Sequence, residues 1–211
     1  SSWSKIQLIE NIDVIFELLT IMNPQSITWS KDLFGIASQM AKDFDEIDQY
    51  NVDAENLFAY LKVVKSMETW SPDDKIMTSV ESEYINFFKK LIDYYNDLRK
   101  KLSEKNYGYY GLITRKLANM NDEELVKTVG NNKIIFAGFN AMTATEEDII
   151  VRLVDNGKAE ILWDLDKYYF DNEKQEAGLF ARAFFDKHKN IKKTFIGDNF
   201  HNKTINVIGA S

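Results

Sequence analysis

Two acidic residues beside a predicted strand offer the clearest candidate chemistry in this sequence. Asp164 and Asp166 follow the apolar run 159–163, which predicts a buried strand. Carboxylates with this spacing can hold Mg²⁺ and a substrate phosphate, as in phosphatases of the haloacid dehalogenase type, or the metal of a glycosyltransferase. Tyr168 stands where that phosphatase pattern has Thr or Val. This difference favours a solvated loop or a helix cap over a phosphatase site.

Other catalytic signatures are absent from the sequence. It contains no P-loop and no G-x-G-x-x-G, G-x-S-x-G or H-E-x-x-H pattern. The lack of cysteine excludes a disulfide scaffold, a thiol nucleophile and a thiolate zinc site. The only two histidines, His188 and His201, argue against a histidine-rich metal site. We therefore expect no cofactor and no metal ion in these residues.

Charge is distributed unevenly along the chain. The formal net charge of −7 equals that of residues 1–60, which hold ten acidic and three basic residues, whereas residues 87–116 hold eight basic and three acidic ones. A basic block of this kind is typical of a solvated helix face, and phosphate binding is the alternative. The candidate DNA-binding residues lie in this block: Arg99, Lys100, Lys101, Lys105, Arg115 and Lys116.

The acidic segment 43–48 is a second cluster of carboxylates, and its role is left open. A metal site is one interpretation. On a helix, however, Phe44 and Ile47 would face the core while Asp45 and Asp48 would point to water. This pattern favours a solvated helix face.

Apolar periodicity predicts successive helices over residues 1–130. Ile9, Ile12, Phe16 and Leu19 recur at helical spacing and predict the buried face of a first helix. Ser30 and Asp53 are candidate caps of a second and a third helix. The longest stripe predicts a helix of about 25–30 residues, and it is formed by Val80, Tyr84, Phe87, Leu91, Tyr94, Leu98 and Leu102.

The period changes after Lys133. Two short apolar runs, 134–137 and 159–163, predict strands on either side of a helix, and a βαβ unit implies that these strands are parallel. A helix over 174–187 and a strand over 204–208 would continue the pattern. We therefore expect a predominantly helical α/β fold, with a helical region at 1–130 and an α/β segment at 131–211. The start without methionine and the end just after a predicted strand indicate a piece of a longer protein.

The segments that follow the two predicted strands resemble motifs of a known family. In superfamily 1 helicases, the Walker B motif belongs where 134–140 lies, and the next motif belongs where 162–169 lies. Both segments, together with 43–54 and 109–115, are similar to bacterial proteins of the PD-(D/E)XK nuclease family related to the B subunit of the AddAB helicase–nuclease. The corresponding helicase-motif loops contain Phe139, Asn140, Thr143, Glu146, Asp164, Asp166 and Tyr168.

The resemblance implies a degenerate helicase module. Ala137 and Gly138 occupy the positions of the Mg²⁺-binding Asp and the catalytic Glu, and neither can bind a metal or polarise water. It also implies a partial RecA-like domain with a helical insertion, without ATP hydrolysis in these residues. The parent would be an ATP-dependent exonuclease or helicase-type hydrolase of double-strand break repair.

The partners implied by this resemblance are DNA and a helicase–nuclease partner subunit. The chain would act as a DNA-handling scaffold in the cytoplasm. No apolar run is long enough for a membrane span, so we expect no membrane partner. The alternative is a helical protein-interaction module without DNA binding. A Mg²⁺-dependent phosphatase that uses Asp164 and Asp166 is a third interpretation.

Overall fold

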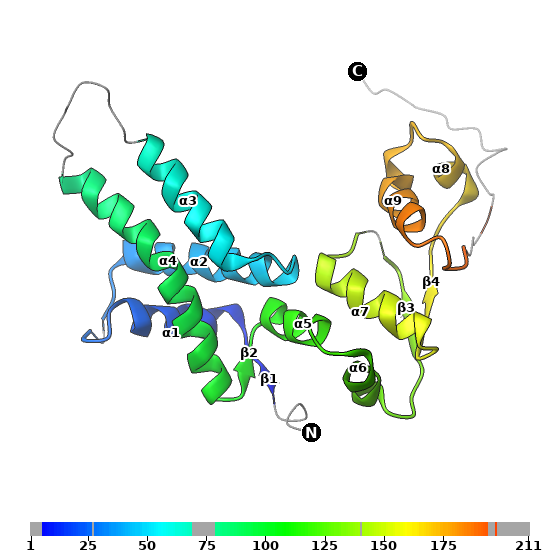
Figure 1. Cartoon of the computed structure of the whole chain (residues 1–211), viewed down its shortest axis with the longest axis horizontal. Coiled ribbons are helices and arrows are strands. Elements are labelled where there is room, and N and C mark those ends of the chain that lie inside the picture. Colours follow the sequence, from blue (N-terminus) through cyan, green and yellow to red (C-terminus); the bar gives the residue numbers. More distant parts are fainter. Residues whose placement is uncertain (1–5, 27, 69–78, 140, 194–196, 198–211) are drawn as a thin grey trace, which may run out of the picture. The chain divides into compact units, whose positions relative to one another are not determined.

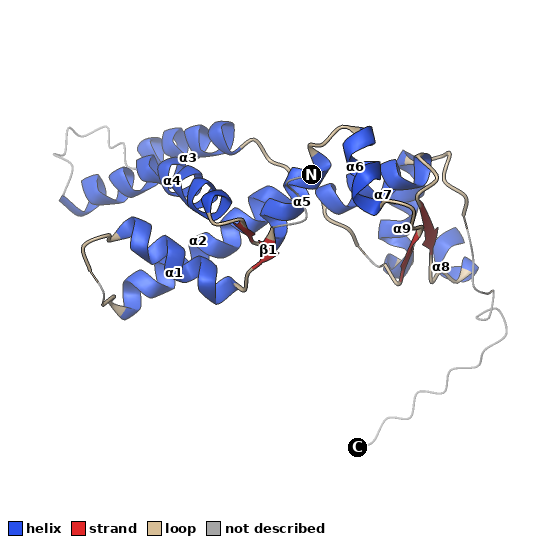
Figure 2. Cartoon of the chain, turned by 90° about the horizontal axis from the view of Figure 1, so that it is seen from below, coloured by secondary structure: helices blue, strands red, loops and turns tan. Residues whose placement is uncertain are grey.

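The computed structural model describes residues 6–26, 28–68, 79–139, 141–193 and 197 (Figure 1). It is mostly helical and has two small parallel sheets of two strands each, which confirms the predominantly helical α/β fold (Figure 2). The chain divides into two compact units: the first is 1–120 with 144–146, and the second is 121–143 with 147–211. In the described part, no helix is long and apolar enough to cross a membrane.

The first unit consists of helices and one small sheet. Strand β1 pairs in parallel with β2, and Gln7 lies opposite Tyr107. The elements are β1 (Gln7–Leu8), α1 (Asn11–Met22), α2 (Lys31–Gln49), α3 (Ala54–Glu68), α4 (Ser79–Glu104), β2 (Tyr107–Gly108) and α5 (Tyr110–Ala118). Helix α4 is 26 residues long, which confirms the predicted length of the longest helix.

The predicted helix caps are present in this unit. The Ser30 hydroxyl accepts a hydrogen bond from the Leu33 backbone amide at 3.1 Å, and Asp53 accepts one from Asn56 at 3.0 Å. Each cap satisfies a backbone amide at the start of a helix that has no partner within the helix. The starts of α2 and α3 are therefore determined by local sequence.

The predicted buried face of α1 is wrong in part. Leu19 is buried, but Ile12 and Phe16 are 42% and 45% exposed, and the other core residues of this helix are Val14, Ile15 and Leu18. Helix α1 is apolar around most of its circumference, so spacing alone did not single out the face that packs on α2 and α4.

The core of the first unit is built from apolar and aromatic side chains of its helices. Phe44 of α2 packs edge-on against Phe58 of α3 and Tyr95 of α4, with ring centroids 6.1 and 5.2 Å apart. On α4, Leu91, Leu98 and Leu102 are buried as predicted. Tyr95 is buried as well, whereas the predicted Tyr94 is only partly buried. The side chains of Val80 and Tyr84 lie outside the described residues.

The second unit contains the predicted parallel pair of strands. Strands β3 and β4 pair in register, so that Ile134 lies opposite Ala159 and Ala137 opposite Leu162. Its elements are α6 (Asp122–Val129), β3 (Ile134–Ala137), α7 (Ala144–Asp155, whose first turn belongs to the first unit), β4 (Ala159–Leu162), α8 (Lys167–Asp171), a 3₁₀ turn (Glu176–Gly178) and α9 (Leu179–Lys187).

Two details of the second unit differ from the prediction or lie beyond the described residues. The helix expected over 174–187 begins only at Leu179, after the short 3₁₀ turn. The strand predicted over 204–208 lies outside the described residues.

The core of the second unit forms around Trp163. Its ring centroid lies 5.0 Å from that of Phe184 and 5.3 Å from that of Phe185.

Helix α5 approaches α2 so closely that only glycine fits at the contact. The Gly111 amide donates a hydrogen bond to the Asp45 carboxylate at 2.6 Å, and a Cβ at this position would lie 2.2 Å from the Asp45 carbonyl oxygen. Gly35, in contrast, lies in the exposed part of α2 with nothing within 4 Å of an added Cβ. The two glycines therefore form a matched pair.

We predict opposite effects of alanine at these two positions. Gly111→Ala should lower the free energy of unfolding by about 2 kcal/mol or more, because the backbone of α2 must move. Gly35→Ala should raise it by about 0.5–1 kcal/mol, because alanine loses less conformational freedom than glycine in a helix. Urea unfolding measures both values, and a similar change in both variants would contradict the close contact.

Candidate functional site

A buried carboxylate lies at the centre of the first unit. Asp48 of α2 is 0% exposed and accepts hydrogen bonds from the hydroxyls of Tyr95 on α4 and Tyr109, the residue before α5. Arg115 Nη1 lies 3.4 Å from Asp48 Oδ1. The prediction that Asp48 points to water is wrong. Positions four residues apart share a helix face, so Asp48 lies on the same side as the buried Phe44.

The sequence also predicted the orientations of Phe44, Ile47 and Asp45 on this helix. Phe44 and Ile47 are buried, as predicted. Asp45 is only half-buried and does not simply face water, because it accepts hydrogen bonds from the Gly111 amide and the Gln49 side chain. This acidic segment is thus partly an internal polar contact, and not only a solvated helix face.

The hydroxyls around Asp48 remain protonated donors. Burial raises the pKa of Tyr95 well above its usual value, and the hydrogen bond to the Asp48 carboxylate raises it further. Burial and the negative charge of Asp48 likewise raise the pKa of Tyr109. Two hydroxyl donors and one cation therefore surround this carboxylate, which is the arrangement that a buried charge requires.

Arg115, one of the predicted DNA-binding residues, has a structural role. Its Nη1 donates hydrogen bonds to the carbonyl oxygens of Val52 at 2.7 Å and Ile47 at 3.4 Å, besides its ion pair with Asp48. This guanidinium therefore joins α5 to the end of α2 and to the connection that leads to α3.

Two other predicted DNA-binding residues are paired with an acid of α1. Lys101 Nζ lies 2.8 Å from Glu17, and Lys105 forms a second ion pair with the same carboxylate. Burial raises the pKa of Glu17, but the hydrogen bonds and charges of the two lysines outweigh burial and bring the pKa below its usual value. Their charges are therefore partly neutralised.

The remaining predicted cations form no ion pair in the part of the chain that the structure describes. Arg99 Nη1 donates a hydrogen bond to the Tyr95 hydroxyl at 3.1 Å, and its guanidinium lies 5.0 Å from the centre of that ring. Partial burial lowers the pKa of Lys116, and the positive charge of Arg99 lowers it further. Within the described residues, neither Lys116 nor the exposed Lys100 forms an ion pair.

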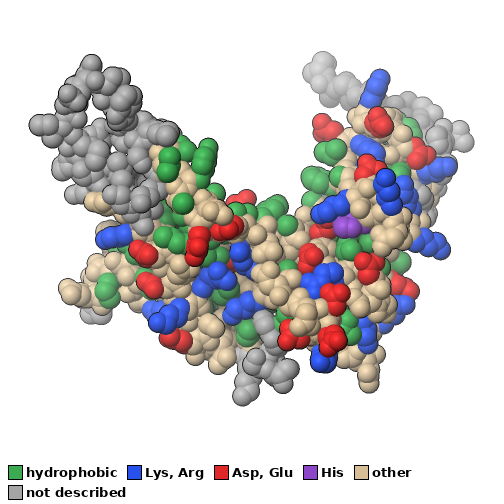
Figure 3. All heavy atoms as spheres, in the orientation of Figure 1, with side chains coloured by type: hydrophobic (Ala, Val, Ile, Leu, Met, Phe, Trp, Pro, Cys, Tyr) green, Lys and Arg blue, Asp and Glu red, His purple; other side chains and the backbone are tan. Residues whose placement is uncertain are grey.

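These cations form the candidate phosphate-binding surface, which we define as Arg99, Lys100 and Lys116. Figure 3 shows Lys and Arg side chains gathered on the face where α4 lies in Figure 1. Arg99 and Arg115 lie near Tyr95, and the charge of Lys116 interacts with those of Arg99 and the buried Asp48. A surplus of positive charge on neighbouring helices attracts an anion such as phosphate.

The segments that follow β3 and β4, where the sequence predicts helicase motifs, start together at one edge of a sheet. Because β3 and β4 pair in register, the residues that follow Ala137 and Leu162 leave the strands side by side. Ala137, Gly138 and Asp164 are exposed there. The described residues contain no group of three or more His, Asp or Glu side chains that could hold a metal ion.

The other side chains of these segments have local contacts. Asp166 accepts a hydrogen bond from the Tyr168 amide at 2.9 Å and caps α8, which confirms the helix-cap interpretation for this residue. Phe139 packs near Trp163, with ring centroids 6.1 Å apart. The Thr143 carbonyl accepts a bond from the amide of Glu147 in α7.

Two predicted positions of these segments remain, Glu146 and Asn140, and the structure describes only Glu146. Within the first unit, the Glu146 carboxylate accepts a hydrogen bond from the Tyr110 hydroxyl. Asn140 lies outside the described residues. The two strand-end segments therefore share a sheet edge, and among the described residues they bring together no group of three or more acids or histidines that could hold a metal ion.

Comparison with protein-family models and with curated proteins finds no match to this chain. The candidate site is therefore defined by geometry and charge. It lies in the first unit, where the sequence had predicted a basic surface but not the buried carboxylate beneath it.

We predict that Asp48→Asn lowers the free energy of unfolding by about 3 kcal/mol, because Arg115 loses its buried counter-charge. The matched control is Asp43→Asn, since Asp43 is exposed on the same helix and accepts a hydrogen bond from the neutral Gln39 side chain, with no ion pair among the described residues. We expect a change of about 0.5 kcal/mol or less in this control. Urea unfolding measures both changes, and an equal loss of unfolding free energy in the two variants would contradict a stabilising role of the Asp48 network.

The ion pairs of Glu17 predict a pH-dependent contribution to stability. The folded-state pKa of Glu17 lies below 4.5, so the pairs stabilise the fold above that pH and are lost as pH falls through the folded pKa. Glu17→Gln should cost about 1 kcal/mol at pH 7, and its difference from wild type should vanish in acid. Thermal unfolding between pH 3 and 7 measures this stability difference, and the control is Glu104→Gln, at an exposed position.

Proposed function

We propose that this chain is a non-catalytic, helicase-like segment that handles DNA, and that Arg99, Lys100 and Lys116 contact DNA phosphates. The observation that carries the proposal is that Arg99 and Lys116 lie close enough to repel each other, while neither forms an ion pair within the described residues. Mutual repulsion makes such a pair costly unless an anion lies between the charges, and DNA presents closely spaced phosphates.

The proposal includes the finer fold assignment and the parent protein. The adjacent parallel strands β3 and β4, joined through α7, are consistent with part of a RecA-like domain. Ala137 and Gly138 at the end of β3 offer no carboxylate, so this segment would contribute binding without ATP hydrolysis. The parent would be an ATP-dependent exonuclease or helicase-type protein of double-strand break repair that acts in the cytoplasm with a partner subunit.

We do not propose the phosphatase. Its second carboxylate, Asp166, caps α8 through the Tyr168 amide. Two carboxylates alone supply few ligands for a catalytic Mg²⁺, and the described residues contain no larger metal-binding group.

The structure offers a matched test of DNA binding within the predicted basic set. Arg99→Gln/Lys116→Gln removes the two clustered charges, whereas Lys101→Gln/Lys105→Gln removes two charges that are paired with Glu17. Fluorescence anisotropy with a labelled duplex of about 20 base pairs, at about 50 and 200 mM salt, measures affinity and its salt dependence for the full chain.

We expect the Arg99/Lys116 variant to bind about tenfold more weakly at low salt, and its log–log salt slope to fall by about 2. The Lys101/Lys105 variant should stay within about twofold of wild type. Thermal unfolding of each variant separates lost binding from lost folding. Equal effects of the two variants, or the absence of salt-dependent DNA binding by the wild type, would contradict the proposal.

A further inference from the structure

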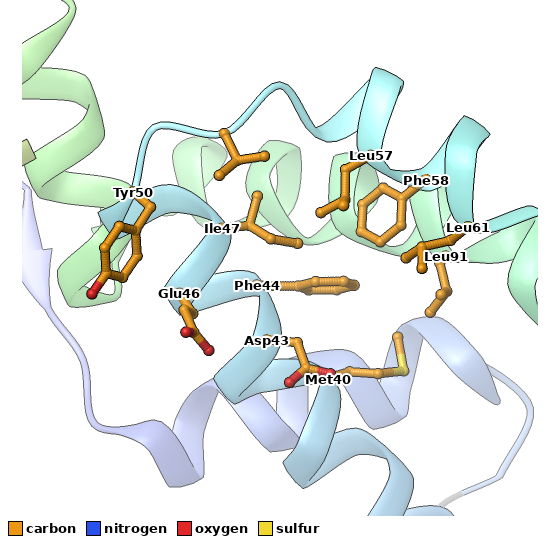
Figure 4. Close-up of a pocket in the computed structure, with 11 residues that line it drawn as sticks. Met40, Asp43, Phe44, Glu46, Ile47, Tyr50, Leu57, Phe58, Leu61 and Leu91 are labelled. Atoms are coloured by element: carbon orange, nitrogen blue, oxygen red, sulfur yellow. The ribbon is translucent and has the colours of Figure 1, made fainter. Parts of the chain in front are cut away.

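A groove of about 410 Å³ lies between α2, α3 and α4 in the first unit, and none of Arg99, Lys100 and Lys116 lines it (Figure 4). Phe44 and Ile47 of α2 line it together with Leu57 and Leu61 of α3. The volume is at the lower end of the range of ligand sites, about 300–1,000 Å³, and fits a few large apolar side chains.

The apolar floor of the groove is part of the packed core. Phe44 is buried and packs edge-on against Phe58 and Tyr95 in the core of the unit. The apolar surface continues towards the end of α2, where Tyr50 is 52% exposed and Val52 36% exposed. A partner with an apolar stripe would therefore bury existing surface and require little rearrangement.

One rim of the groove is acidic. Asp43 and Glu46 are exposed and three residues apart on α2, so they lie on neighbouring turns of the same face. Figure 4 shows both carboxylates on the α2 side and Leu57 and Leu61 on the α3 side. Asp43 accepts a hydrogen bond from the neutral Gln39 side chain, and neither carboxylate forms an ion pair among the described residues.

Charge complementarity defines the occupant. Residues 1–60, which supply the acidic rim, carry the whole net charge of −7. This part of the surface repels DNA and attracts cations. A groove between helices, with one apolar and one acidic side, matches a helix whose apolar stripe is bordered by Lys or Arg.

We propose that this groove binds a basic amphipathic helix of a partner protein. Apolar side chains of that helix would lie against Phe44, Ile47 and Leu57, and its Lys or Arg side chains would pair with Asp43 and Glu46. This inference does not depend on the DNA proposal, since it uses other residues and the opposite charge.

The test is a display library of helical peptides of about 16 residues, screened against the full chain at moderate salt. Enriched peptides should carry bulky apolar residues at helical spacing with Lys or Arg beside them. The affinity of the best peptide is then measured by fluorescence anisotropy for wild type, for Asp43→Lys/Glu46→Lys and for the control Asp93→Lys/Asp97→Lys. The control makes the same charge change at exposed positions of α4 outside the groove.

Asp43→Lys/Glu46→Lys should weaken this peptide by about tenfold or more, whereas the control should stay within about twofold. A peptide whose basic residues are replaced by Glu should regain affinity for the Asp43/Glu46 variant, which shows that the effect is not unfolding. Arg99→Gln/Lys116→Gln should leave peptide binding unchanged and so separates this inference from the DNA proposal.

Three results would overturn the inference: a library that enriches no basic amphipathic peptide, equal loss of binding in the groove and control variants, and no loss in either.

Discussion

The buried carboxylate of Asp48 is the interaction on which the first unit depends. A charge of this kind is costly to remove from water, and the cost is offset only when its hydrogen-bonding capacity is filled. The hydroxyls of Tyr95 and Tyr109 and the guanidinium of Arg115 do so here. These three residues come from α4 and from the start and body of α5, so one side chain fixes both helices against α2. The positions of Arg99 and Lys116 on those helices follow from that constraint.

Helix α2 shows that the face of a helix, more than the residue type, decides what an acidic side chain does. Four carboxylates between residues 43 and 48 have different surroundings. Asp43 and Glu46 are exposed on the rim of the groove, Asp45 accepts a hydrogen bond from the Gly111 amide, and Asp48 is fully buried. A step of about 100° per residue carries the chain from water to core within two turns. The same helix therefore supports an internal network on one side and an acidic surface on another.

The sequence predicted local features well and long-range partners poorly. The caps at Ser30 and Asp53, the length of α4 and the parallel pair β3–β4 depend on neighbouring residues or on a short βαβ spacing. The Asp48 network joins residues 47 and 61 positions apart, and nothing in the periodicity marks such partners. Spacing also could not choose between Tyr94 and Tyr95, because adjacent tyrosines fit the stripe almost equally well. The predicted buried face of α1 was wrong in part for a related reason, because this helix is apolar on more than one face.

The basic block illustrates why local charge is a poor guide to a binding surface until its partners are known. Lys101 and Lys105 reach back to Glu17, 84 and 88 residues earlier in the chain, and Arg115 binds Asp48 and two backbone carbonyls. These cations stabilise the fold, whereas Arg99, Lys100 and Lys116 form no ion pair among the described residues and keep their charge for an anion. The acidic groove attracts basic partners and repels polyanions, and the basic surface does the reverse. The two surfaces therefore select partners of opposite charge. The two proposals therefore concern separate surfaces of the first unit, one acidic and one basic, and each can hold without the other.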